Sequence, residues 1–434
     1  MALPPYAAET LTLEARALLT RLGRVRPFAE IMPMVGAASV SAEAARAVEH
    51  HLLRGRRELR VRVRGYLRWL KGPQGRGATA AEAQRRFAFL KLLFNAGLTQ
   101  FDIFADALSL RGEVDNGVWL SGLDVAAEDA ICLASRFFDA PPVITYLDRG
   151  HGAAIRRART RLPGGGENPV AIIRVPRERM VGSGIASSLV HEVGHQGAEL
   201  IDLVGSMRLA LHARQREARG DELLAWRLWE RWISEIVADF WAVAKLGVSA
   251  TQGLMQVVSL PRAFVFRIQI DDPHPFPWVR VKLSAAVGST LYPDPQWQLL
   301  DRLWESFYPR EGLGADRLRI IAALEATMPE FIRLLLHHRP KALHGASLVQ
   351  VFPIRERQPE RLRALYEAWR KQPARVRRAA PTLVLAVLGQ AKQDRRMTPE
   401  KESHMVAFLL RHWALRRALG DVQEAARTPR AVAA

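Results

Sequence analysis

The chain has 434 residues, of which 49% are hydrophobic and 25% are charged, and its formal net charge at pH 7 is +19. This composition excludes a disordered or collagen-like chain, and the length is ample for a buried core. A single cysteine, Cys132, excludes a disulfide scaffold and a zinc site built from cysteines alone. The positive charge favours an anionic partner, such as nucleic acid, lipid headgroups or an acidic polypeptide.

The sequence predicts a soluble, cytoplasmic protein without a transmembrane segment. Its longest apolar candidate, residues 381–388, is far shorter than the roughly 20 residues that cross a bilayer. The N-terminus carries acidic residues early and lacks the basic region and apolar stretch of an export signal.

Residues 1–140 are expected to form a helical N-terminal region, because apolar side chains recur there at three- and four-residue spacings. Ser41 is a candidate N-cap, and Cys132 is expected to pack within a helix. The arginine-rich face of residues 54–68 either contacts nucleic acid or anionic lipid, or is a plain solvated helix face. The expected helices span 7–22, 41–53, 52–70, 81–96, 102–110 and 124–138.

Residues 141–295 are expected to form a mixed α/β centre, and residues 296–434 a helical C-terminal region punctuated by prolines. The fold class is therefore mainly α (α+β) with a small mixed sheet. Ser183 is the expected N-cap of the first long central helix. The central elements are strands at 143–147 and 170–175, a small helix at 153–162, and long helices at 184–204 and 221–246.

The first long central helix contains a His-Glu-x-x-His pattern, formed by His191, Glu192 and His195. Histidines at positions i and i+4 lie one turn apart on the same helix face, so both imidazoles can reach one ion. The glutamate beside them can hold and deprotonate a metal-bound water. In isolation the pattern also occurs by chance, as polar residues on an unrelated helix.

The second long central helix adds two carboxylates, Glu235 and Asp239, again at positions i and i+4. Two carboxylates on a buried face are costly unless they are paired or bound to a cation. Because a catalytic zinc site needs three protein ligands, we expect Glu235 to be the third. Asp239 would then accept the other ring N–H of a ligand histidine. The alternative is a pair of structural salt bridges to arginines.

These two motifs resemble the gluzincin class of zinc metallopeptidases. The Glu-Ile-Val-Ala-Asp form at 235–239 is closest to the group that contains the CAAX prenyl protease and the HtpX-type peptidases. That group also carries a His-Pro element and a later arginine, which His274 and Arg280 match. The resemblance covers about residues 165–290. It implies a zincin-like core within 141–295.

The resemblance also implies a role for the strand at 170–175, whose open edge would pair with an extended peptide substrate. The alternative is an ordinary interior strand. His274 or Arg280 would stabilise the oxyanion that develops during hydrolysis. For His274, the alternative is a structural histidine that closes a turn, with Asp271 or Asp272 as its partner.

The sequence therefore predicts a zinc metallopeptidase, an endopeptidase that hydrolyses protein or peptide substrates. One Zn²⁺ per chain would be bound by His191, His195 and Glu235, with Glu192 as the base that activates water. Two other classes of function stay open. One is a basic regulatory or nucleic-acid-associated protein with an HExxH domain, and the other is a non-catalytic adaptor with the zincin fold.

Overall fold

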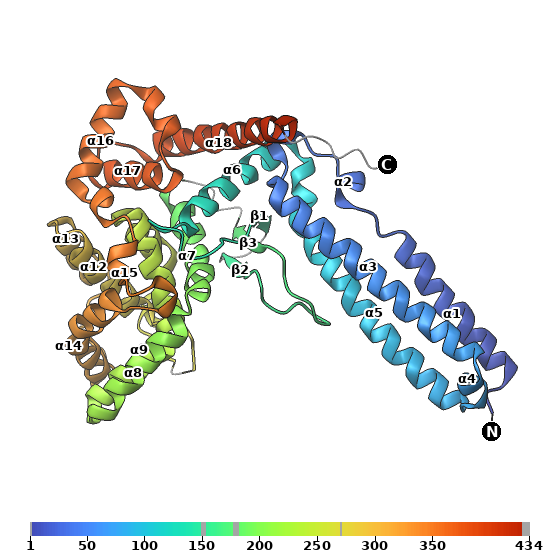
Figure 1. Cartoon of the computed structure of the whole chain (residues 1–434). Coiled ribbons are helices and arrows are strands. Elements are labelled where there is room, and N and C mark those ends of the chain that lie inside the picture. The colour runs from blue at the N-terminus through green and yellow to red at the C-terminus, as the bar shows by residue number, and fades with distance from the viewer. Residues whose placement is uncertain (1, 149–152, 177–181, 270, 428–434) are drawn as a thin grey trace.

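A computed structural model of the chain describes residues 2–148, 153–176, 182–269 and 271–427. The protein is mainly helical, with 74% helix and 4% strand, and it contains a small three-stranded mixed sheet. This confirms the expected mainly α class with a small mixed sheet. Figure 1 shows an arm of long helices that projects from a wider helical body, with the sheet between them.

The arm consists of three long helices, α1, α3 and α5, which all pack against one another (Figure 1). Ser41 is confirmed as the N-cap of α3, because its hydroxyl accepts a hydrogen bond of 3.2 Å from the Ala44 N–H. The helices expected at 81–96 and 102–110 are one continuous helix, in which Gly97 permits close contact with Leu59 of α3. The elements are α1 (Pro5–Gly23), α2 (Phe28–Ile31), α3 (Ala42–Lys71), α4 (Pro73–Gly77) and α5 (Ala80–Ser109).

The sheet has the strand order β1-β3-β2. Strand β1 (Val143–Asp148) pairs in parallel with β3 (Ala171–Pro176), and β2 (Ala154–Arg156) pairs antiparallel with the other edge of β3. The two strands predicted from β-branched residues are thereby confirmed. Strand β3 is central, so the expectation that it offers an open edge to a substrate is wrong. Among the described residues, β2 pairs along one edge only.

The small helix expected at 153–162 is also wrong, because this segment contains β2 and a turn. Ile155 lies opposite Ile173 in the antiparallel ladder. Beyond the strand, the Ala158 N–H donates to the Gln196 side chain at 2.7 Å, and the Asn168 amide donates to the Arg157 carbonyl at 3.0 Å. These hydrogen bonds stabilise the strand and the turn, although the local sequence pattern weakly favours a helix.

Of the central helices, α6 and α7 pack against the sheet, and α7 and α9 carry the candidate site. Helix α6 ends seven residues earlier than expected, so that Cys132 lies exposed just beyond its end rather than packed within it. Asp202, in a left-handed conformation, separates α7 from α8 before the expected end at Val204. The elements are α6 (Val114–Ile131), α7 (Ser183–Leu200), α8 (Leu203–Glu217), α9 (Gly220–Leu246), α10 (Val248–Val258), α11 (Arg262–Val265) and α12 (Pro277–Leu291).

Gly182 is the N-cap of α7, so the expectation that Ser183 is the N-cap is wrong. Gly182 has a φ of 61°, and a side chain at this position would meet the carboxylate of Glu402 at 2.4 Å. A glycine therefore suits both the backbone conformation and the close approach of the C-terminal helix.

The C-terminal helices belong to the body. Three of them begin at a proline, in agreement with the helical region interrupted by prolines that the sequence predicted. The elements are α13 (Gln296–Phe307), α14 (Ala315–His337), α15 (Leu348–Val351), α16 (Pro359–Lys371), α17 (Pro381–Gln393) and α18 (Pro399–Arg427). Short 3₁₀ helices occur at η1 (Gly36–Ala38), η2 (Leu110–Gly112), η4 (Lys341–Leu343), η5 (Ile354–Arg357) and η6 (Pro373–Arg378).

Buried hydrophobic side chains form two clusters. The smaller cluster fills the arm up to Leu108 and reaches the sheet at Ile144 and Ile172. The larger cluster extends from Trp119 to Trp413, so α6, the central helices and the C-terminal helices share one core. The expected division into regions 1–140, 141–295 and 296–434 stays a prediction, while the two cores separate between Leu108 and Trp119.

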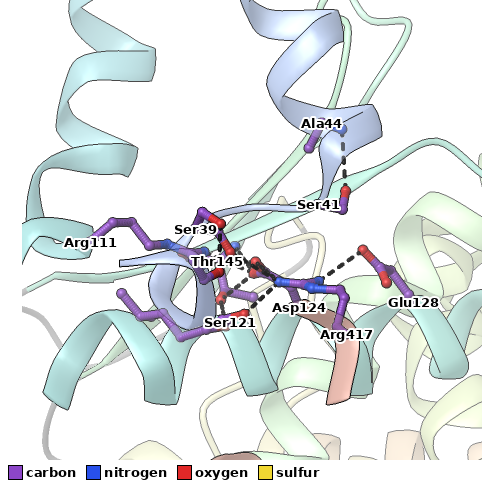
Figure 2. A network of polar contacts seen from close by, with 11 residues as sticks. Ser39, Ser41, Ala44, Arg111, Ser121, Asp124, Glu128, Thr145 and Arg417 are labelled. Carbon is purple, nitrogen blue, oxygen red and sulfur yellow. Dashed lines mark hydrogen bonds and ion pairs between the residues drawn. The ribbon is translucent and has the colours of Figure 1, made fainter. Parts of the chain in front are cut away.

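A buried polar network joins the arm to the body (Figure 2). The side chains of Arg111 and Asp124 are fully buried and form an ion pair, with an Nη2–Oδ1 distance of 2.9 Å. Asp124 also accepts a hydrogen bond of 2.7 Å from the Thr145 hydroxyl of β1. Arg417 of α18 approaches the same carboxylate, at 3.3 Å. One acidic side chain therefore connects η2, α6, β1 and α18.

One helical stretch among the described residues, Ala80–Gly112, is long and apolar enough to span a membrane by length and composition. Its most apolar window has a mean hydropathy of 1.2, and 33% of that window is buried within the protein. A core helix of a soluble protein passes the same criteria. The expectations of no transmembrane segment and of a cytoplasmic location therefore stay predictions.

Candidate metal centre

Helix α7 brings the two histidines of the His-Glu-x-x-His pattern together. Leu189 and Val193 of this helix are buried in the larger core, which fixes the orientation of the opposite face. On that face, the imidazole rings of His191 and His195 lie 4.9 Å apart between centroids and nearly perpendicular to each other. The structure therefore places both rings beside one another, as the i, i+4 spacing predicted.

Helix α9 brings Glu235 to these rings. The Nε2 atom of His191 lies 3.3 Å from Oε2 of Glu235, and Nε2 of His195 lies 3.4 Å from Oε1. One ligand atom from each residue lies within 4.8 Å of the other two, so these three residues could together hold a metal ion.

Two glycines of α7 permit this close approach of α9. A side chain at Gly194 would lie 2.9 Å from the Ala238 backbone, and one at Gly197 would lie 2.3 Å from the buried ring of Trp241. Sequence reasoning missed this role. The signal was available, because Gly194 and Gly197 lie one turn apart on the metal helix.

Asp239 orients His191 and is itself held by Arg280. The Nδ1 atom of His191 donates to Oδ1 of Asp239 at 2.8 Å, which leaves Nε2 facing Glu235. Arg280 donates from Nε and Nη2 to the same carboxylate, at 2.6 and 2.9 Å. Arg280 also approaches Glu235, at 3.5 Å. The two shortest hydrogen bonds of Arg280 both go to Asp239, so Arg280 holds this carboxylate in position.

The groups around the site shift the pKa values of His191 and His195 in opposite directions. Burial opposes a charged imidazole at His191, but the Asp239 carboxylate outweighs it and raises the pKa of His191 to about 9. Burial, together with the charge of His191, lowers the pKa of His195 to about 4. His195 therefore presents a neutral imidazole at neutral pH.

The two carboxylates stay ionised although both are buried. Burial alone would raise the pKa of Glu235, yet His191, His195 and Arg280 hold it at about 2. The charges of Arg280 and His191 hold the pKa of Asp239 well below its usual range, again against burial. The site therefore offers an anionic oxygen donor at Glu235.

Glu192 lines a cleft in front of this cluster. Its side chain is only 8% exposed, and burial raises its pKa above the usual range. The cleft has a volume of about 190 Å³. Its inner wall is aliphatic and comes from α9 and α10, with the side chains of Ala242, Val243, Ala250, Leu254 and Val257.

His274 reaches the same cleft from the segment between α11 and α12. Its Nδ1 atom lies 2.8 Å from Oδ1 of Asp272, and its Nε2 atom lies 3.5 Å from Oε2 of Glu235. The ring is 52% exposed, at the mouth of the cleft. The structure thus contains the Asp272 contact expected of a turn and also brings His274 to the site.

All seven residues that the sequence singled out lie in or against this cleft. Those residues are His191, Glu192, His195, Glu235, Asp239, His274 and Arg280. Sequence reasoning missed the serines that line the cleft, because neither Ser187 nor Ser284 belongs to a recognised motif.

No family model, no curated protein and no solved structure matches this chain. The resemblance to gluzincins therefore rests on the motif residues, and it stays a hypothesis.

Proposed function

We propose that this protein is a zinc-dependent metallopeptidase with its centre at the cluster of α7 and α9. The observation that carries the proposal is the convergence of His191, His195 and Glu235, whose nitrogen and oxygen atoms face one another across 3.3 and 3.4 Å. Glu192 lines the same cleft. Two imidazoles, one carboxylate and a second glutamate at an open cleft form the donor set of a catalytic zinc site.

The residues present fit a zinc ion. His195 is neutral, Glu235 is ionised, and Asp239 fixes the His191 ring with Nε2 toward the cluster. Zinc, when bound, would polarise the scissile carbonyl and lower the pKa of a coordinated water. Because the pKa of His191 lies above neutrality without the ion, His191 must lose its proton for binding, so the affinity for zinc rises with pH.

Glu192 is the base in this proposal. Its carboxylate takes the proton of the attacking water and passes it to the leaving amine. The raised pKa of Glu192 suits this transfer, because a carboxylate in a partly dry cleft is a stronger base than one in water.

His274 and Arg280 have different roles in the proposal. Asp272 anchors His274 at the cleft mouth, with its Nε2 atom 3.5 Å from Oε2 of Glu235, so in this proposal Nε2 would donate to an oxyanion that develops beside Glu235. Arg280 is engaged by Asp239 through two hydrogen bonds, so it holds the orienting carboxylate in place. The substrate is a peptide, for which the aliphatic wall of the cleft offers a site for an apolar side chain.

The test compares hydrolysis of denatured casein by the wild-type protein with hydrolysis by Glu192→Gln. Glutamine is nearly isosteric but cannot accept the proton, so turnover should fall by about 10²–10⁴-fold while zinc content stays unchanged. A chelator should abolish wild-type activity, and added zinc should restore it.

Glu199→Gln is the matched control, since Glu199 lies on the same helix but is exposed and paired with Arg157. This variant should retain full activity. A wild-type protein that binds zinc but hydrolyses neither casein nor a mixed peptide library would favour the non-catalytic adaptor. Near-normal turnover by Glu192→Gln would exclude Glu192 as the base.

A further inference from the structure

The positive charge of the protein is concentrated on one helix of the arm. Residues 54–71 of α3 contain eight basic residues and one acidic residue, out of 63 and 44 in the whole chain. This segment therefore contributes +7 to a net charge of +19 within 18 residues. A general preference for arginine codons would spread basic residues along the chain and would not concentrate them on one helix.

Several basic residues of this segment lie on the outward face of α3, whereas Arg54 and Arg62 line a pocket formed with α5. The buried face is formed by residues such as Leu59, Val63 and Leu70. Arg57, Arg64 and Arg68 lie on the opposite face and are exposed. Among the described residues, no acidic side chain forms an ion pair with these three arginines or with Arg54, Arg60 and Lys71.

Aliphatic side chains lie between these arginines. Leu53 is 47% exposed and Val61 is 59% exposed. Val61 and Leu67 line a shallow groove along α3 whose other residues are Arg64, Arg68 and Lys71. Residues 53–71 contain no asparagine, glutamine, serine or threonine that could read a base edge. Their two aromatic residues are not free to stack on a base, because Tyr66 is buried and Trp69 is half-buried with the Arg86 guanidinium 4.3 Å from its ring centre.

We propose that the outward face of α3 docks the protein on an anionic membrane surface. Alternating arginines and aliphatic residues on an exposed helix suit the interface, because guanidinium groups bind lipid phosphates while the aliphatic groups enter the headgroup layer. Helix α3 is 30 residues long, or about 45 Å, and the arm projects from the body, so the face is accessible to a flat surface (Figure 1). This proposal is independent of the metal centre.

The test is flotation of the full-length protein with vesicles of phosphatidylcholine, alone or with about 30% phosphatidylglycerol, at low and high salt. The wild-type protein should bind the anionic vesicles at low salt, and not the neutral ones. The triple variant Arg57→Gln, Arg64→Gln and Arg68→Gln should lower the partition coefficient at least tenfold. Val61→Ser should weaken binding severalfold without changing the net charge.

The matched control is the triple variant Arg302→Gln, Arg317→Gln and Arg378→Gln, which removes the same charge from exposed positions on the body. It should bind within twofold of wild type. An equal loss of vesicle binding in both triple variants would show that binding depends on net charge alone, which would overturn the proposal. So would tighter binding to duplex DNA than to anionic vesicles, with no effect of Val61→Ser. Binding that survives about 1 M salt would indicate insertion of α5 instead of surface docking.

Discussion

Asp239 connects the candidate ligand His191 to Arg280. It accepts the Nδ1 proton of His191, and it is the residue to which Arg280 donates twice. An uncompensated carboxylate at this depth would be costly, so Arg280 stabilises Asp239 while Asp239 orients the ligand histidine. These contacts separate the orienting acid from the candidate ligand, Glu235.

Replacing Asp239 by asparagine should weaken zinc binding by about 10–100-fold without abolishing it, because asparagine keeps the size of the side chain but removes its charge. Competition with a chromophoric chelator measures this affinity. Asp301→Asn is the control, since Asp301 is a partly buried carboxylate that pairs with Lys282 away from the cleft. Damage equal to that of Glu235→Gln would identify Asp239 as a ligand.

The candidate site could be predicted from the sequence because each pair of its residues lies one helical turn apart. His191 with His195, and Glu235 with Asp239, needed no tertiary information beyond helix periodicity. The contact between Asp239 and Arg280 could not be predicted in the same way, since it joins residues 41 positions apart on different helices.

At the scale of elements, the metal centre depends on how closely α7 and α9 pack. Gly194 and Gly197 face α9, where Ala238 and Trp241 fill the space that side chains would need. The backbones can therefore approach far enough for the carboxylate of α9 to reach the imidazoles of α7. A wider separation would pull Glu235 away from both rings.

Gly197→Ala should destabilise the protein by about 1–3 kcal/mol, because the new methyl group would lie 2.3 Å from the buried Trp241 ring. Zinc affinity should fall with it. Chemical denaturation and chelator competition measure the two effects. The matched control is Gly65→Ala in α3, where a side chain meets nothing within 4 Å and should stabilise the helix by about 0.5–1 kcal/mol. Unchanged stability of Gly197→Ala would show that helix spacing does not limit the site.

Helices and strands with a strong local sequence pattern could be predicted. Those that depend on contacts with residues far away in the sequence could not. Helix α9 and strand β1 match the expected ranges closely, because amphipathic or β-branched patterns act locally. Strand β2 is three residues long and depends on pairing with β3, so a local pattern could not reveal it. The same pairing makes β3 central, and among the described residues it leaves β1 and β2 as the two edge strands.

At the scale of the whole molecule, the arm and the body are joined through the network of Arg111 and Asp124 (Figure 2). Both side chains are fully buried, and Thr145 and Arg417 complete the contacts of the carboxylate. Local periodicity gives no sign of this connection, which brings together residues up to 306 positions apart. The same limit applies to α6, which follows the arm helices in the chain but packs in the larger core.

Asp124→Asn should lower the free energy of unfolding by about 3–5 kcal/mol, because it leaves the buried Arg111 without its counter-charge. Urea denaturation measures this loss. Asp115→Asn is the control, since the pair of Asp115 with Arg411 is exposed and should contribute about 0–1 kcal/mol. Equal small effects of the two substitutions would show that the network does not hold the arm to the body.

Metal analysis of the purified full-length protein measures whether His191, His195 and Glu235 bind one zinc ion. We predict about one zinc per chain in the wild-type protein, and a sharp loss in each of His191→Ala, His195→Ala and Glu235→Ala. His212→Ala is the control, because His212 is half-exposed and lies on α8, outside the cluster. A wild-type protein that takes up no zinc, or a Glu235→Ala variant with full occupancy, would contradict the account.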